Sequence, residues 1–129
     1  MTFQHAVLWM DHALAIILWL GPTDTQRVLV HNQHRHLHAN PDCLGARMER
    51  DRLYFTAVSQ ALGDVPEILL LGPGQERADF GAWMKAHHPR RAQHILHSTP
   101  WPRASDGELA AEGRRFFKAA DRMRPQPHS

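Results

Sequence analysis

A short, uninterrupted apolar segment in the middle of the chain constrains the fold more than any other feature. Residues 67–71 are followed at once by Gly72-Pro73-Gly74, and then by a segment that carries Phe80 and Met84 at helical spacing. A strand whose two faces are both covered has such a continuous apolar sequence, because neither face meets water. The sequence therefore predicts a buried strand, a tight turn and a helix, which are the units of an α/β protein.

The first third of the chain has a different pattern. Two apolar segments, Ala6–Met10 and Leu14–Leu20, are separated by Asp11-His12-Ala13, and a third segment, Arg27–Asn32, follows a turn at residues 21–24. Short apolar segments that are joined by turn residues predict antiparallel strands. We expect the aspartate of the first turn to accept a hydrogen bond from a nearby backbone N–H.

Two further helices and one strand complete the predicted order. Helical spacing runs from Asn40-Pro41-Asp42 to Leu62 and stops at Gly63, His94–His97 is a short strand, and Ser105-Asp106-Gly107-Glu108 is a capping box that opens a last helix. The order β-β-β-α-β-α-β-α predicts a five-stranded mixed sheet with helices on both faces, the ribonuclease H-like arrangement. We expect residues 1–124 to form a single domain and residues 125–129 to form a frayed tail.

Composition limits the class of protein. The chain has 129 residues, 43% of them hydrophobic, which suits one core, and its single cysteine, Cys43, excludes an internal disulfide framework. We therefore expect a protein of a reducing compartment, most simply the cytoplasm. The longest apolar segment, Ala13–Leu20, is far shorter than the roughly 20 residues that a membrane span requires. We expect no membrane partner, and a homo-oligomer is left open.

Cationic side chains gather in the last third of the chain. The formal charge is +2 at pH 7, and 11 histidines gain charge as the pH falls. This excess favours a partner that carries phosphate, although cations in the last turns of a helix also complement its dipole. The candidate nucleic-acid-binding residues are Arg90, Arg91, Arg114, Arg115 and Lys118, with Gln33 nearer the N-terminus.

Four histidines lie within eight residues, and they are His31, His34, His36 and His38. If this segment is extended, the last three share one face at intervals of about 6.5–7 Å. Imidazole binds zinc and other divalent transition metals, carries protons near pH 7 and, once protonated, contacts phosphate. The segment can therefore be a metal site, a loop that faces nucleic acid or handles protons, or inert surface. We expect no cofactor other than such a metal ion.

The sequence holds no complete catalytic motif. A metal-dependent nuclease of this fold needs several carboxylates beside the first strand, and Asp11 has no acidic partner at the end of the strand over 67–71. Gly72-Pro73-Gly74 lacks the Lys-Ser/Thr ending of a phosphate-binding loop. Neither Cys43 nor any serine lies in a nucleophile motif. We therefore predict no catalytic residues.

Three stretches taken together resemble a known family. They are Val7–His12, Glu67–Gly74, and Ser105–Leu109 with Phe116–Asp121. They resemble the small bacterial proteins called translational machinery proteins, a family similar to the central domain of archaeal and eukaryotic class 1 release factors and of Pelota. The resemblance covers nearly the whole chain, and it implies the same ribonuclease H-like fold.

The resemblance also implies a place on or near the ribosome. In the release factors, the loop between the third strand and the first long helix carries Gly-Gly-Gln, which helps water attack the peptidyl-tRNA ester. The corresponding segment here, His31–Cys43, has no Gly-Gly-Gln, and its single glutamine is Gln33. We therefore expect an RNA-, tRNA- or ribosome-associated protein of rescue, quality control or dormancy, without catalysis. Two alternatives stay open: a small hydrolase that uses a His-bound metal ion and its activated water, and a structural or oligomerising module.

We predict that zinc or nickel binds to the His-rich segment. Replacement of His34, His36 and His38 by alanine should weaken the binding that calorimetry of the untagged protein measures. Lower pH should also weaken it, because protons compete with the metal for imidazole. Undiminished zinc binding by the triple variant would show that this segment is not a site.

Overall fold

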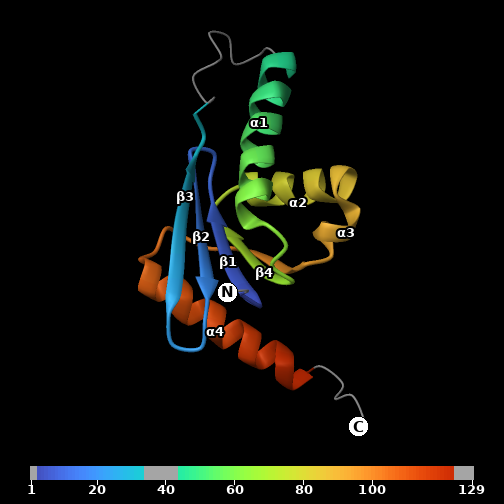
Figure 1. The fold of residues 1–129 in the computed structure, drawn as a ribbon. Helices are drawn as coiled ribbons and strands as arrows, with labels where there is room; N and C mark the ends of the chain where they lie inside the picture. Colours follow the sequence, from blue (N-terminus) through green and yellow to red (C-terminus); the bar gives the residue numbers. More distant parts are fainter. Residues whose placement is uncertain (1–2, 34–43, 124–129) are drawn as a thin grey trace.

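The computed structural model describes residues 3–33 and 44–123 (Figure 1). Its strands are β1 (His5–Met10), β2 (Leu14–Leu20), β3 (Thr25–His31), β4 (Glu67–Gly72) and β5 (Ile95–Pro100). Its helices are α1 (Leu44–Leu62), α2 (Glu76–His87), α3 (Pro89–Ala92) and α4 (Asp106–Met123). None of the helices within the described residues combines the length and the apolar character that crossing a bilayer requires.

The five strands form one mixed sheet in the order β3-β2-β1-β4-β5. β1 pairs antiparallel with β2, and β2 pairs antiparallel with β3. β4 pairs parallel with β1 on one side and parallel with β5 on the other. The ribonuclease H-like α/β fold expected from the sequence is therefore confirmed.

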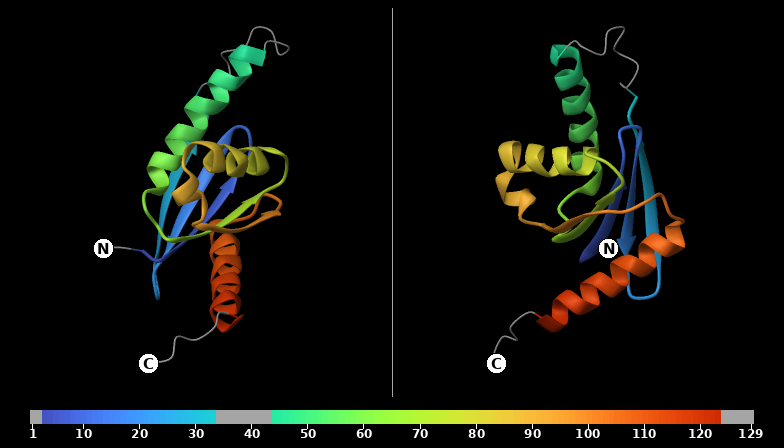
Figure 2. Two further views of the ribbon diagram at one scale, coloured as in Figure 1. Left: turned by 90° about the vertical axis from the view of Figure 1, so that its right-hand side faces the viewer. Right: turned by 180° about the vertical axis from the view of Figure 1, so that it is seen from behind.

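Helices cover both faces of the sheet, as predicted (Figure 2). On one face, Leu8 and Leu70 pack with side chains of α1 and α2, among them Val58 and Phe80. On the other face, Val7, Trp9, Leu69 and Leu71 pack with side chains of α4, of which Leu109 and Phe117 are buried. Successive residues of a strand point to opposite faces, so both sets of β4 side chains enter a core. This explains why the sequence of β4 is apolar without alternation.

The edges of the sheet depart from the predicted boundaries. β5 runs to Pro100 instead of His97, because its residues pair with β4 as far as Gly72, although their polar side chains give no apolar signal. A one-turn helix, α3, precedes it and was not predicted. The predicted helix start at Asn40-Pro41-Asp42 and the predicted tail at residues 125–129 lie outside the described residues.

The end of α1 and the start of α4 have the residues that the sequence predicts for helix termini. Gly63 follows α1 with a φ of 66°, a left-handed conformation that glycine adopts without strain. At the start of α4, the Ser105 hydroxyl oxygen accepts a hydrogen bond from the N–H of Glu108 at 3.2 Å. The same hydroxyl donates to the Glu108 carboxylate at 3.0 Å. The predicted helix start is therefore confirmed, although the carboxylate bonds the hydroxyl instead of the backbone N–H of a capping box.

We predict that Gly113→Ala destabilises the protein by about 1–3 kcal/mol, because its new methyl group has no room. The added Cβ would lie well inside van der Waals contact of Val7 Cγ2, and 2.8 Å from Leu20 Cδ1. Gly81→Ala is the matched control, since its Cβ would meet nothing within 4 Å and helical alanine is favoured over glycine by roughly 0.5–1 kcal/mol. Chemical denaturation measures both, and equal stabilisation by the two substitutions would contradict the packing of α4 on the sheet.

Candidate functional site

The carboxyl end of β1 meets the first turn of the sheet, and hydrogen bonds fix this region. Asp11 Oδ1 accepts hydrogen bonds from the N–H groups of Ala13 and Leu14, both at 2.8 Å. The Asn32 side chain donates to the carbonyl oxygen of His12 at 2.8 Å, and the Tyr54 hydroxyl donates to that of Asp11 at 2.9 Å. The predicted turn bond of Asp11 is therefore confirmed.

Burial raises the pKa of the Tyr54 phenol far above its usual value, and the negative charges of Glu76 and Asp11 raise it further. The phenol therefore stays protonated and acts as a hydrogen-bond donor. Sequence reasoning did not assign Glu76 to this region, because the residue follows β4 only after the intervening turn at residues 73–75. Its effect on Tyr54 depends on how α1 and α2 pack together.

His31 and Gln33 lie at this same end of the sheet. Both are exposed, and they border a hollow of 300 Å³ between β3 and α1. His34, His36, His38 and Cys43 lie outside the described residues. The metal site and the nucleic-acid contact expected of this segment therefore stay predictions.

Two of the predicted phosphate-binding arginines hold the fold together. The Arg91 guanidinium donates to Ser59 Oγ at 2.8 Å and to the carbonyl oxygens of Ser59 and Gly63 at 2.6 and 2.7 Å, at the end of α1. The Arg114 guanidinium donates to the carbonyl oxygens of Gly21 and Asp24 at 2.7 and 3.0 Å, in the turn between β2 and β3. These structural roles were not foreseen from the sequence.

The remaining three cations lie at the surface. Arg115 forms an exposed ion pair with Glu112 on the same helix. Arg90 and Lys118 are exposed as well. Phosphate binding by these side chains stays a prediction.

The structure does not bring the predicted binding residues onto one surface. Arg90 and Arg91 belong to α3, beside the end of α1, whereas Arg114 and its neighbours belong to α4 on the opposite face of the sheet (Figure 2). Arg114 and the His-rich segment also lie at opposite ends of the sheet. Arg114 contacts Thr25 at the start of β3, and His31 is the last residue of β3. Six residue steps of about 3.3 Å each place the backbones of Thr25 and His31 about 20 Å apart.

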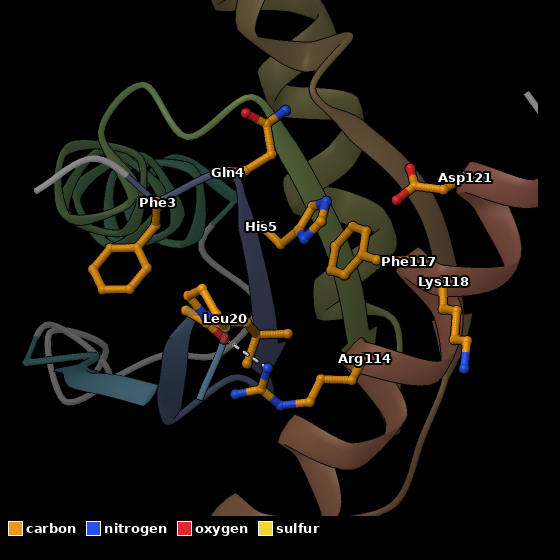
Figure 3. Close-up of a pocket in the computed structure, with 10 residues that line it drawn as sticks. Phe3, Gln4, His5, Leu20, Arg114, Phe117, Lys118 and Asp121 are labelled. Carbon is orange, nitrogen blue, oxygen red and sulfur yellow. Dashed lines mark hydrogen bonds between the residues drawn. The ribbon is translucent and has the colours of Figure 1, made fainter. Parts of the chain in front are cut away.

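A cavity of 540 Å³ lies at the end of the sheet away from His31 (Figure 3). His5 from β1 borders it, and its ring stacks on the ring of Phe117 from α4 with the centroids 4.2 Å apart. The His5 Nε2 atom lies 3.6 Å from the carboxylate of Glu67, the first residue of β4. Asp121, in the C-terminal part of α4, also lines the cavity.

Within the described parts of the chain, His5, Glu67 and Asp121 are the one group of three potential metal ligands whose atoms lie within 4.8 Å of one another. Sequence reasoning missed this cluster altogether. The parallel register sets His5 opposite Glu67, and no sequence spacing reveals that pairing.

Several solved structures match this chain over nearly its whole length. The Pelota protein of Thermoplasma acidophilum is 20% identical, with a TM-score of 0.56, and the match covers 94% of this chain and 39% of that one. Archaeoglobus fulgidus Pelota is 14% identical, with a TM-score of 0.59, and the match covers 95% of this chain and 38% of that one. An archaeal translation termination factor, aRF1, is 12% identical with a TM-score of 0.49, over 92% of this chain and 38% of that one.

These matches show a shared fold, and this chain spans less than two fifths of the length of either Pelota protein. No family model matches the sequence, and neither does any curated protein. The resemblance to Pelota is therefore supported at the level of the fold.

We predict that Tyr54 keeps its proton in the native protein well above pH 10. As the single tyrosine, it gives any phenolate absorbance alone. The unfolded chain should titrate near pH 10, whereas the native protein should ionise only as it unfolds. Because the folded state holds the proton more tightly, stability should fall as the pH rises above about 10. Alkaline titration followed by near-ultraviolet absorbance and circular dichroism measures this, and native ionisation near pH 10 would contradict it.

Proposed function

We propose that this chain is an RNA-, tRNA- or ribosome-associated protein of the translation apparatus, in rescue, quality control or dormancy, and that it binds without catalysing a reaction. The observation that carries the proposal is the fold shared with two Pelota proteins over 94% and 95% of the chain. It agrees with the resemblance of three sequence stretches to release-factor and Pelota central domains. A ribosomal partner would make the cytoplasm the site of action.

Two features favour a binding role over catalysis. The segment His31–Cys43, which corresponds to the loop that carries Gly-Gly-Gln in the release factors, lacks that motif. At the carboxyl end of β1, where a nuclease of this fold needs carboxylates, the Asp11 Oδ1 atom already accepts two backbone hydrogen bonds. A carboxylate oxygen engaged in this way is needed for the turn.

The outer face of α4 is the surface that we propose for phosphate contacts. Arg115, Lys118 and Arg122 are exposed and follow one another at spacings of three and four residues, which places them along one side of the helix. Between residues 113 and 123 the helix carries four cationic side chains and a single acidic one. Arg114 is the exception among these cations, since its guanidinium is directed to the β2–β3 turn. The alternative group around Arg90 lies on the other side of the sheet.

The test is co-sedimentation of the untagged protein with ribosomes in sucrose gradients over a series of salt concentrations. Each phosphate that the protein neutralises should contribute a logarithmic salt slope of about 0.7 for single-stranded RNA. The double variant Arg115→Gln with Lys118→Gln should bind more weakly, and its slope should fall by about 1.4. Arg114 is left intact because its substitution would disturb the fold.

The matched control is Arg52→Gln with Lys85→Gln, which removes the same charge from exposed positions of α1 and α2, on the other side of the sheet. We expect its sedimentation to equal that of the wild type. Equal weakening by both double variants would show that net charge, and not the face of α4, decides binding. A wild-type protein that stays at the top of the gradient at low salt would contradict ribosome association itself.

A further inference from the structure

His5, Glu67 and Asp121 come from three separate elements and meet at the end of the sheet opposite His31. We propose that these three side chains bind a divalent transition metal ion of the zinc type. This site is independent of the phosphate contacts proposed for α4. It also differs from the metal site expected at His34, His36 and His38.

The spacing of His5 and Glu67 suits two ligands of one metal ion. The His5 Nε2 atom lies 3.6 Å from the nearer Glu67 oxygen, and the ligand atoms of all three residues lie within 4.8 Å of one another. A hydrogen bond between nitrogen and oxygen would be about 2.7–3.2 Å long. Ligand atoms at about 2.0–2.2 Å from a tetrahedral zinc ion lie about 3.3–3.6 Å apart. The separation of His5 from Glu67 therefore matches two ligands of one ion.

Rigid elements hold two of these ligands in place. His5 and Glu67 are opposite each other at the start of the parallel pairing of β1 with β4, two inner strands of the sheet. The Glu67 side chain is only 8% exposed and that of His5 25% exposed, and stacking on Phe117 fixes the plane of the imidazole. A ligand set that is held by strands loses little conformational entropy when the ion binds.

Asp121 completes the set from the side of the cavity. It is exposed on α4, one turn beyond Phe117, and Figure 3 shows its carboxylate on the same side of the helix as the His5 ring. Because Asp121 lies at the surface, it also offers a substitution that leaves the core unchanged.

The chemistry of the ligands selects the ion. One imidazole nitrogen and two carboxylates form a mixed nitrogen and oxygen set, which zinc and its neighbours accept, whereas magnesium and calcium prefer oxygen ligands alone. Three protein ligands leave the fourth position of a tetrahedral ion open, as in zinc sites that bind water or a substrate atom. His5, Asp121 and Lys118 line the cavity of 540 Å³.

The experiment uses the untagged full-length chain in which His31, His34, His36 and His38 are replaced by alanine, so that the His-rich segment cannot contribute. Titration with zinc against a chromogenic chelator should show one bound ion per chain. Asp121→Asn in this background should weaken binding about tenfold or more. Asp64→Asn, which changes another exposed aspartate, is the matched control and should leave the affinity unchanged.

Cobalt gives a second measurement that does not depend on affinity. The ligand-field absorption of Co²⁺ bound to the background chain should be lost or altered by Asp121→Asn and by His5→Ala, and retained by Asp64→Asn. Excess magnesium should not displace the ion. The proposal is overturned if the background chain shows no saturable zinc binding, or if the Asp121 and Asp64 variants bind zinc equally well.

Discussion

Both faces of the central strands β1 and β4 have to be covered, because every residue of β4 and all but the first of β1 is buried. Alternate side chains of each strand enter two different cores. One core needs α1 and α2, and the other needs α4 with its close approach at Gly113. The three layers of the molecule therefore follow from the burial of two strands, and so do the positions of the residues at their ends.

The two ends of the sheet use their polar side chains in different ways. At the carboxyl end of β1, the polar groups of Asp11, Asn32 and Tyr54 hold the turn and the adjoining helix in place. At the opposite end, His5 and Glu67 face each other beside a cavity, and α4 adds a third potential ligand. The end of the sheet for which the sequence predicts a functional site is thus stabilised by hydrogen bonds within the protein. The opposite end, where the sequence shows no motif, holds the cluster of potential metal ligands.

Arg91 and Arg114 show why a count of cationic residues does not by itself locate a phosphate-binding surface. Arg91 and Arg114 each donate to two backbone carbonyl oxygens, one pair at the end of a helix and the other in a tight turn. The carbonyl oxygens of Ser59 and Asp24 also accept a backbone N–H, and a carbonyl oxygen has two lone pairs. A guanidinium with several fixed donors can bond more than one such oxygen. A cation count over the last third of the chain includes these side chains, although their guanidinium donors already make hydrogen bonds within the fold.

The sequence by itself determined the order of the elements other than α3, the fold class and the number of layers. Periodicity, the turn residues, the capping serine before α4 and Gly63 after α1 are local signals, and the physics behind each involves neighbouring residues only. Tertiary structure alone decided that Arg91 caps α1, that Glu76 acts on Tyr54 and that His5 meets Glu67 and Asp121. Those contacts join residues far apart in the chain, and the register of β1 with β4 and the packing of α4 set them.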